Sequence, residues 1–374
     1  MDVYWYWPYV RREELALATG LLRAGDHLAV HSTPRPTDPV VSPHPDCEIL
    51  PPLPGVDERT AEGSLRWAAS RGTTYLARAR ARAAEVRGGH HDLAHVVYLN
   101  PFVDWVALRR LARQVPLVSS VHDVTPHQRR MPEALERRVL ARQYAHAGTI
   151  VVHHGWVRDR LIAEFAIDPN RVHVVPAQVI PAPPVEAGPT DGPPEVLFFG
   201  TFRRNKGIAV LLEAIRRLPS DLELRVVLAG RGFADVERAV REAAVRDPRI
   251  LPEIGYATAQ RKAELYARAT LNVLPYTAFE SQSAVLQDAY AHGVPLVVTS
   301  VGALGDTVRD EGTGIVVPPA DADALAEAIT TLVSDPTAHA RAADATRRVA
   351  EARHPARVGA RLREVYAEVL GSPQ

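Results

Sequence analysis

Two series of short apolar runs, each run followed by a longer amphipathic stretch, constrain the fold of this chain most strongly. The first series runs from Asp2–Tyr6 to Val172–Val175, and the second begins with the run Val196–Gly200. Short, almost continuously apolar runs that alternate with helical stretches are typical of parallel sheets covered by helices on both faces. The pattern therefore predicts two α/β units, each with a doubly wound parallel sheet.

The first half of the chain is predicted to contain both strands and helices. Its strand candidates are Asp2–Tyr6, His27–His31, Ala94–Leu99, Leu117–Val121, Thr149–Val152 and Val172–Val175. Helical stretches are expected at Arg11–Arg23, Ser64–Val86, Trp105–Arg113 and Pro132–His146. The proline-rich segment Pro34–Arg59 is predicted to be irregular.

A proline-rich segment separates the two series. Six prolines lie between Pro181 and Pro194, and proline stiffens a linker because its ring fixes φ. We therefore expect a Rossmann-like domain at 1–180, a linker at 181–194 and a second Rossmann-like domain at 195–356. The helix predicted at 357–370 is expected to join the first domain. At 374 residues the chain exceeds the size at which a single core keeps growing.

The charge balance argues against several classes of partner. The 44 basic and 44 acidic side chains cancel, whereas a nucleic-acid or anionic-membrane surface needs a basic excess. Peripheral membrane contact is therefore not favoured. The single cysteine, Cys47, cannot form an internal disulfide, and no run approaches the ~20 apolar residues that span a bilayer. With no signal-peptide pattern at the start, we expect a cytoplasmic protein.

The segment Phe198–Gly207 is the first candidate site. A buried strand is predicted to end at Gly200, and a helix to begin after Gly207. Free amides and the dipole at a helix start favour anions, and Arg203 and Lys206 add two cations. Such a group would neutralise a departing diphosphate. A basic turn with solvated charges fits this segment alone equally well. Of the 44 basic residues only Lys206 and Lys262 are lysines, so both positions are candidates for a required compact ammonium.

The segment Leu271–Val308 is the second candidate site. A loop carries Glu280, and a helix begins near Ser283 and presents Asp288 eight residues later than Glu280. The first amides of that helix, those of Ser283, Ala284 and Val285, are predicted to hold phosphate or sugar oxygens. The spacing lets one carboxylate meet a sugar and the other meet ribose hydroxyls. A helix cap and a solvated helix face are the simpler alternative.

Together these segments resemble the family-4 retaining glycosyltransferases of the GT-B fold. The resemblance rests on motifs in the family's order: Gly200–Gly207, Leu228–Gly232, Pro275–Asp288, Ala291–Leu304 and Gly314–Asp321. In the first half it rests on Asp92–Pro101 and Val118–His127. It implies two Rossmann-like domains that face each other across a cleft, with a nucleotide-sugar donor bound by the second domain.

The resemblance also implies roles for individual residues. Arg203 and Lys206 would hold the donor diphosphate beside Gly200, Glu280 would lie by the donor sugar, and Asp288 would bind the ribose diol. No metal and no cofactor other than the nucleotide-diphosphate sugar is implied, and the transfer would retain the anomeric configuration.

Further implied contacts involve both domains. His122 would contact the transferring sugar, while Gly230 and the stretch 253–256 would lie near the nucleotide base. The acceptor is not identified: a small molecule, natural product, glycan or lipid-linked acceptor all fit. On the acceptor side we expect His127 and the aromatic cluster of Trp5, Trp7 and Tyr9, because flat rings stack on sugars. A packed first strand explains the aromatic cluster equally well.

The sequence departs from the family pattern in three places. Asp288 stands where the family usually has Glu, which shortens the carboxylate by one methylene. The usual Gly-Gly loop after the first strand is absent, and Ser281-Gln282-Ser283 replaces the usual Pro-Phe-Gly. We interpret the last two as differences in acceptor and donor preference. A nucleotide-sugar epimerase, a sugar phosphorylase and a non-catalytic nucleotide-sugar-binding relative stay as alternative functions.

Two further patterns have simpler interpretations than metal binding. Asp321-Ala322-Asp323 spells the D-x-D of another glycosyltransferase fold, but it opens an apolar-periodic helix and is better explained as an N-cap. The cluster of His90, His91, Asp92 and His95 suggests zinc by composition. No helix would bring these side chains to one face, so we expect no zinc site there.

Overall fold

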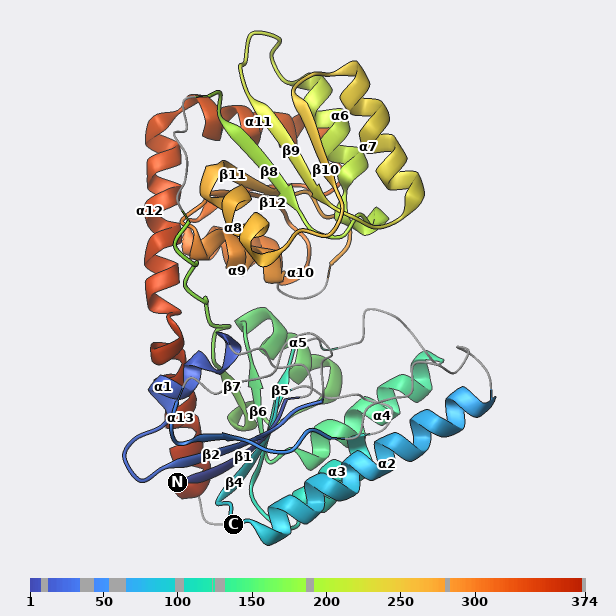
Figure 1. The fold of residues 1–374 in the computed structure, drawn as a ribbon, viewed down its shortest axis with the longest axis vertical. Coiled ribbons are helices and arrows are strands. Elements are labelled where there is room, and N and C mark those ends of the chain that lie inside the picture. The colour runs from blue at the N-terminus through green and yellow to red at the C-terminus, as the bar shows by residue number, and fades with distance from the viewer. Residues whose placement is uncertain are drawn as a thin grey trace. The chain divides into compact units, whose positions relative to one another are not determined.

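The computed structural model describes residues 1–7, 13–33, 44–53, 65–97, 104–122, 124, 132–185, 192–279 and 283–371. The chain divides into two compact units. The first consists of Met1–Gln178 together with Pro355–Gln374, and the second of Val179–His354. Each contains one sheet (Figure 1). The C-terminal helix therefore belongs to the first unit.

Among the described residues, the first unit contains a seven-stranded sheet in the order β3-β2-β1-β4-β5-β6-β7, and all its pairings are parallel. Its strands are β1 (Asp2–Tyr6), β2 (His27–His31), β3 (Cys47–Ile49), β4 (Leu93–Val96), β5 (Leu117–Val121), β6 (Thr149–Val152) and β7 (Val172–Val174). The chain leaves β1 toward β2 and returns to β4 on the other side, which is the doubly wound topology predicted from the apolar runs.

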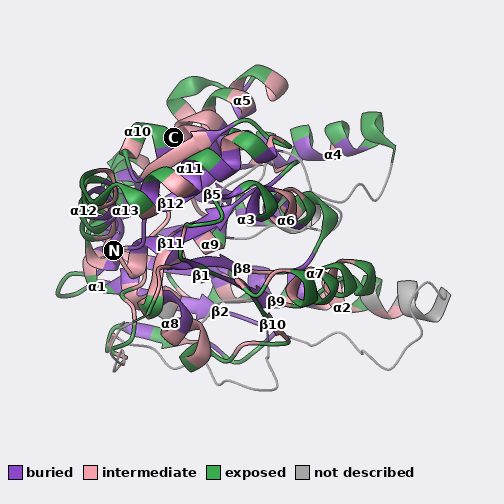
Figure 2. Cartoon of the chain, turned by 90° about the horizontal axis from the view of Figure 1, so that it is seen from above, coloured by how far each residue is buried: buried purple, intermediate pink, exposed green. Residues whose placement is uncertain are grey.

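Helices cover both faces of this sheet. They are the 3₁₀ segments η1 (Glu13–Leu17) and η2 (Pro169–Arg171), and the helices α1 (Ala18–Leu21), α2 (Leu65–Gly88), α3 (Asp104–Leu111), α4 (Glu133–His146), α5 (Gly155–Phe165) and α13 (Pro355–Gly371). Apolar residues of α1 and α13 form one buried cluster with the sheet, and Leu108 and Leu111 of α3 belong to another that contains Tyr4. The sheet is thus buried on both sides, as Figure 2 shows by its colouring.

A buried polar chain fixes α13 to the sheet. The Trp5 indole donates to the Tyr366 hydroxyl (2.9 Å), which lies 2.5 Å from His95 Nδ1, and His95 Nε2 lies 2.9 Å from Ser120 Oγ. The Tyr366 hydroxyl accepts from the indole and still has its own proton to donate, which favours the His95 tautomer that accepts at Nδ1 and donates from Nε2–H to Ser120. Burial, with His153 and His122 nearby, lowers the pKa of His95 to about 3, which keeps the ring neutral.

Several expectations for the first half need correction. The segment Pro34–Arg59 is not wholly irregular, because β3 pairs with β2 at the sheet edge. The stretch predicted as one helix, Arg11–Arg23, is a 3₁₀ turn followed by a single α-helical turn where it is described. Helix α5 begins directly after His154. Its N-cap is His154, whose Nδ1 accepts from the Trp156 amide at 3.1 Å.

In the described part of the second unit, a six-stranded parallel sheet has the order β10-β9-β8-β11-β12-β13. Its strands are β8 (Glu195–Phe199), β9 (Arg225–Gly230), β10 (Ile250–Ile254), β11 (Ala269–Leu274), β12 (Leu296–Thr299) and β13 (Gly314–Val317). The connections include the 3₁₀ turn η3 (Arg204–Lys206) and the helices α6 (Ile208–Arg217), α7 (Ala234–Arg246), α8 (Ala259–Arg268), α9 (Ala284–Ala291), α10 (Gly302–Glu311), α11 (Ala322–Ser334) and α12 (Pro336–Ala352). Two buried clusters, one with α6 and α11 and one with α8 and α9, form the core on the two faces. The predicted α/β class with two doubly wound sheets is confirmed.

Replacing Tyr366 by phenylalanine tests the buried polar chain. The change removes the acceptor of the Trp5 indole and the donor to His95, and buried polar groups left unpaired cost about 1–3 kcal/mol. We therefore expect a lower midpoint in urea or thermal unfolding followed by tryptophan fluorescence. Tyr256→Phe, at an 83% exposed tyrosine, is the control and should leave the midpoint unchanged. Equal midpoints for the two variants would contradict a stabilising role of the chain.

Candidate functional site

The sheet of the second unit reverses its winding direction between β8 and β11. From β8 the chain continues outward to β9 and β10, and it then returns on the other side of β8 to β11, β12 and β13. Open α/β sheets bind ligands at the carboxyl ends of the strands where this reversal occurs, because the two loops there diverge and leave a crevice. Both sequence motifs, Gly200–Gly207 and Pro275–Asp288, follow these two strands.

The loops after β8 and β11 are held together by their backbones. The Thr277 amide donates to the Asn205 carbonyl (3.0 Å), and the Asn205 side-chain amide donates to the Ala278 carbonyl (3.2 Å). Gly207 has φ +67°, and a Cβ there would lie 1.7 Å from the Pro275 carbonyl oxygen. Only glycine permits both the left-handed backbone and this approach. The loops after β8 and β11, which carry the two candidate sites, are thus held in contact with each other.

Lys206 lies over aromatic rings contributed by the β11 loop. Its Nζ is 3.7 Å from the ring centre of Tyr276 and 4.5 Å from that of Phe279. Burial, and secondarily the charge of Arg203, lower the pKa of Lys206 to about 8. The ammonium is therefore still mostly protonated at pH 7, in surroundings that penalise its charge. An anion placed here would relieve that penalty.

Tyr276 connects Lys206 to the start of α9. Its hydroxyl lies 3.0 Å from Oγ of Ser283, the N-cap residue, and both side chains are buried. A Cβ on Gly200 would lie 3.8 Å from the Val285 side chain, so the end of β8 also reaches this helix start. The first amides of a helix have no acceptor within the helix. The backbone amides of residues 283–285, which were predicted to bind oxygens, therefore lie beside the loop that carries Lys206.

Gly230, at the end of β9, packs closely against Gly200 at the start of the loop after β8. Its φ is +147°, and a Cβ there would lie 1.8 Å from the Gly200 carbonyl oxygen. A side chain at this position would therefore push the loops after β8 and β9 apart.

Arg203 is exposed and lies on a different side of the loop from the aromatic rings. It borders a hollow of about 860 Å³ between α6 and α7, yet it is near enough to Lys206 to contribute to the lowered pKa. Its neighbour Arg204 points to Asp235, 2.9 Å away. The two predicted cations are thus adjacent, but Lys206 alone packs against the β11 loop.

Asp288 is engaged by a residue that the resemblance did not assign. Its Oδ1 lies 2.6 Å from Nζ of Lys262 on α8, and the two side chains are 27% and 31% exposed. Lys262 was singled out in the sequence only by the scarcity of lysine. Glu280 lies outside the described residues.

In the first unit, His122 lies at the end of β5 beside a second histidine. Its Nε2–H donates to the Val97 carbonyl at 3.0 Å, and its ring centre is 4.8 Å from that of His153. Loss of water around the ring lowers the pKa of His122, although the residue as a whole is exposed. The ring is therefore neutral at pH 7. For His153 the sequence left two interpretations equally open, a surface turn and a position lining the interdomain cleft.

The predicted acceptor side is changed by the structure. Trp5 is completely buried and bound to Tyr366, so the packed-strand interpretation holds for it and we withdraw it from the acceptor side. Trp7 is partly exposed and packs against Trp5 at a ring distance of 5.9 Å. Tyr9 and His127 lie outside the described residues.

Comparison with known proteins identifies the family. Residues 193–335 match the family model described as glycosyl transferases group 1, and residues 15–180 match that described as glycosyltransferase family 4. The two matches cover both units in the expected order. The chain is a family-4-like glycosyltransferase of the GT-B fold.

Individual relatives agree with this assignment. The D-inositol 3-phosphate glycosyltransferase of Xylanimonas cellulosilytica is 28% identical over 390 residues, which cover 95% of this chain and 90% of the relative. Sucrose-phosphate synthase from Thermosynechococcus elongatus has a similar fold, with a TM-score of 0.77 at 21% identity over the whole of both chains. Anabaena HepE, solved with UDP-glucose, has a TM-score of 0.66 at 17% identity and matches 98% of this chain and 100% of its own.

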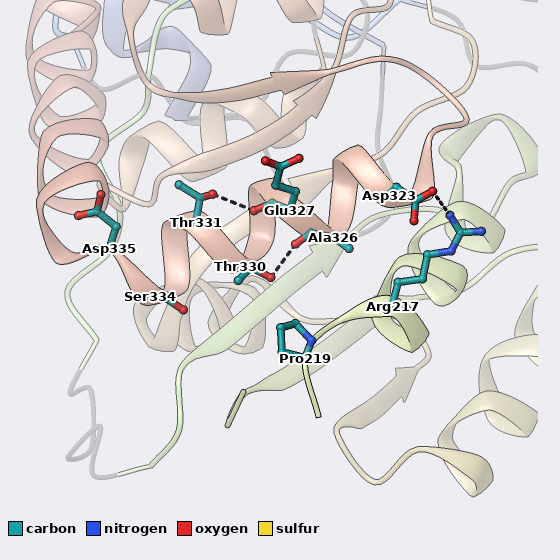
Figure 3. Close-up of a pocket in the computed structure, with 9 residues that line it drawn as sticks. All are labelled: Arg217, Pro219, Asp323, Ala326, Glu327, Thr330, Thr331, Ser334 and Asp335. Carbon is teal, nitrogen blue, oxygen red and sulfur yellow. Dashed lines mark hydrogen bonds and ion pairs between the residues drawn. The ribbon is translucent and has the colours of Figure 1, made fainter. Parts of the chain in front are cut away.

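The two patterns that suggested metal ligands have other roles in this glycosyltransferase. The Asp321 carboxylate accepts from the Ala324 amide at 2.9 Å, which confirms the N-cap interpretation. Asp323 pairs with Arg217 across a hollow of about 510 Å³ between α6 and α11 (Figure 3). That hollow lies at the C-terminal end of α6, remote from Gly207. His91 contacts Asp2 at 2.7 Å, whereas His95 belongs to the buried chain described above.

One finding bears on the membrane. Within the described ranges, no helix combines the length and the apolar character that a transmembrane span requires.

The lowered pKa of Lys206 has a measurable consequence for stability. Below pH 8 the folded and unfolded chains both carry this charge, and the folded protein bears its unfavourable burial. Between about pH 8 and the ordinary lysine value of 10.5, the unfolded chain binds the proton while the folded protein releases it. The free energy of unfolding of the wild type should therefore rise relative to Lys206→Met over this interval, by an amount on the order of 1 kcal/mol.

Urea titrations of both proteins from pH 7 to pH 10.5, without ligand, measure this difference. Titration of tyrosines and of other groups is common to both proteins and cancels. A constant difference across the interval would show that the Lys206 pKa is not depressed.

Proposed function

We propose that this glycosyltransferase takes its sugar from a nucleoside diphosphate sugar and transfers it with retention of configuration, without a divalent metal. The observation that carries the proposal is the contiguous arrangement of Lys206, Tyr276 and Ser283 at the point where the sheet reverses its winding. This arrangement joins a cation to a helix start, and both favour an anion.

Neutralisation of the leaving diphosphate is assigned to protein groups. Lys206 and Arg203 supply positive charge, and the amides of residues 283–285 supply hydrogen bonds from the start of α9. Because Lys206 is already partly desolvated in the free protein, it loses less hydration when the diphosphate binds than a fully exposed lysine would.

In the proposed reaction the bond between the sugar C1 and the diphosphate oxygen breaks, and the acceptor oxygen bonds to C1 from the same face. The electron pair of the broken bond stays on the diphosphate, which takes the proton of the acceptor hydroxyl. The motif resemblance assigns His122 to the transferring sugar and Glu280 to its vicinity. The neutral His122 ring, with Nε2–H fixed by Val97, suits a positioning contact.

The relatives narrow the choice of substrates to be tested. HepE was solved with UDP-glucose, which supports UDP as the first donor nucleotide to test. The name of the Xylanimonas relative supports inositol 3-phosphate as an acceptor, and phosphorylated polyols as a class. The balanced total charge and the composition supply no reason to expect a nucleic-acid substrate.

Nucleotide binding tests the diphosphate site. UDP, GDP, dTDP and ADP are titrated calorimetrically into the wild type, Arg203→Ala, Lys206→Ala and Arg204→Ala. We expect one nucleotide to bind, and its affinity to fall about tenfold or more in the first two variants, because each loses a charge-assisted contact. Arg204→Ala removes an equal charge one residue away, where the guanidinium pairs with Asp235, and should bind like the wild type. Equal losses in all three variants would indicate a general charge effect instead of a site.

Product analysis tests the reaction. The donor with the nucleotide that binds is incubated with inositol 3-phosphate and other polyols, and the anomeric configuration of the product is read by NMR. We expect an acceptor-dependent product with retained configuration, unaffected by EDTA, and a large loss of rate in His122→Ala. Release of nucleoside diphosphate without any acceptor would instead support the epimerase. Binding without turnover of any donor would support the non-catalytic relative.

A further inference from the structure

Two histidines follow neighbouring strands of the first unit's sheet. His122 comes directly after β5 and His153 directly after β6, and the last residues of these strands, Val121 and Val152, are partners in the sheet register. The two histidines therefore lie side by side at the carboxyl edge of the sheet (Figure 1). Their ring centres are 4.8 Å apart, and the ring planes meet at 45°. His122 is exposed and His153 is half-buried, so the pair lies at the surface of this unit.

Each ring donates a hydrogen bond to a carbonyl just beyond the next strand outward in the sheet. His122 Nε2 lies 3.0 Å from the Val97 oxygen, past the end of β4, and His153 Nδ1 lies 2.9 Å from the Val175 oxygen, past the end of β7. A carbonyl oxygen only accepts, so each of these nitrogens carries a hydrogen. Because the lowered pKa keeps His122 neutral, its Nδ1 has no hydrogen and is an acceptor.

The two carbonyls are held in place by the sheet. The Val97 amide donates to the Tyr6 carbonyl, and the Val175 amide donates to the Val152 carbonyl, both at 2.9 Å. These bonds continue the pairing of β1 with β4 and of β6 with β7 by one residue. Both valines are buried. The acceptors of the two histidine rings therefore have fixed positions.

The backbone of His153 is fixed on both sides. Strand β6 precedes it, and His154 after it is the N-cap of α5, whose Nδ1 accepts from the Trp156 amide at 3.1 Å. His153 is thus the one residue between a strand and a helix cap. With its ring also held at Val175, it forms a rigid neighbour for His122.

The contact with His153 supplies what the bond to Val97 alone does not. A single hydrogen bond does not by itself orient an imidazole, because exposed side chains exchange rotamers rapidly. The tautomer of a histidine is set by the bond that its protonated nitrogen makes, so loss of the bond to Val97 would let Nδ1 become a donor. Val97 follows β4 and His153 follows β6, which lie on opposite sides of β5. The His122 ring is therefore held from both sides.

Metal binding does not explain why histidines gather at this edge. A third ring, that of His95 on β4, uses both nitrogens in contacts with Tyr366 and Ser120. His122 and His153 each use one nitrogen on a backbone carbonyl. Across the described ranges, no group of three or more histidine, cysteine or acidic side chains is arranged to hold a metal ion. The pair is better explained by the orientation of one ring by the other.

We propose that His153 is a positioning residue for sugar transfer. Its ring keeps that of His122 on the Val97 carbonyl, so that Nε2–H stays engaged there and Nδ1 is the nitrogen that accepts from the transferring sugar. His153 acts through His122 and is assigned no contact with the substrate. The inference goes beyond the sugar contact of His122 and rests on the proposed function, because the role exists only if His122 takes part in transfer.

Two substitutions separate the ring of His153 from its hydrogen bond. His153→Asn keeps an N–H donor for the Val175 carbonyl but removes the ring, whereas His153→Phe keeps a flat ring beside His122 but has no donor. NMR of protein with isotope-labelled histidines reports which nitrogen of His122 carries the hydrogen, and His122→Ala identifies its signals. We expect Nε2–H in the wild type, a mixture of both tautomers in His153→Asn, and a smaller change in His153→Phe.

Steady-state kinetics gives the functional readout. The donor and acceptor are those that product analysis identifies, with UDP-glucose and inositol 3-phosphate tried first. We expect kcat to fall about tenfold in His153→Asn, because a misoriented contact group costs rate, and to fall less in His153→Phe. The dissociation constant of the nucleoside diphosphate should not change, since its proposed site belongs to the second unit. His27→Asn, at a 40% exposed side chain on the first residue of β2, is the matched control and should leave both readouts unchanged.

The possible failures are distinguishable. If the wild type transfers no sugar, the proposed function and this inference fall together. If it transfers sugar and His153→Asn has the wild-type kcat, the inference alone is overturned. A lower kcat with an unchanged His122 tautomer would also overturn it, because His153 would then contact the substrate directly or only maintain the fold. Unfolding midpoints of all variants show that they are folded.

Discussion

The close approach of the loops after β8 and β11 is the constraint on which the second unit depends. Two neighbouring parallel strands whose chain connections diverge leave a crevice at their carboxyl ends, but an open crevice does not position side chains. Here the Gly207 backbone lies against the Pro275 carbonyl, and Asn205 is hydrogen-bonded to both Thr277 and Ala278. This junction holds Lys206 of the first loop against the Tyr276 and Phe279 rings of the second. The ammonium of Lys206 therefore has a fixed environment.

That environment keeps a cation available. Several charged side chains elsewhere in the unit form ion pairs, for example Arg217 with Asp323 and Arg249 with Asp247. Among the described residues Lys206 has no carboxylate within ion-pair distance, and its ammonium instead lies on the faces of Tyr276 and Phe279. Aromatic rings attract a cation without cancelling its charge. The cost of holding it there is visible in the lowered pKa, and an anionic ligand is the partner that would offset this cost.

Features of the fold and the site could be predicted from sequence where the pattern that indicates them lies within one short segment of the chain. The strands of the second sheet are near-continuous apolar runs with glycine or proline at their ends, so their positions followed from the pattern. Strand β3 did not, because three residues in a proline-rich stretch pair only with the neighbouring β2. The contact of Lys262 with Asp288 joins residues on two helices, and it depends on how α8 and α9 are rotated against each other. For Trp5, stacking on a sugar and packing in the core predict the same aromatic pattern. The hydrogen bond that distinguishes them comes from Tyr366, at the other end of the chain.

The two lysines of the chain illustrate one physical requirement in different surroundings. An arginine at 206 would spread its charge over a plane with five donors, and an arginine at 262 would saturate the carboxylate it faces. A lysine concentrates its charge on one nitrogen, and in both places that nitrogen is held by groups that leave it unsaturated: two rings in one case, a single oxygen in the other. Positive charge that is positioned yet incompletely paired is what an anionic diphosphate would need from the protein. The strong bias toward arginine elsewhere makes these two exceptions the most informative basic positions in the sequence.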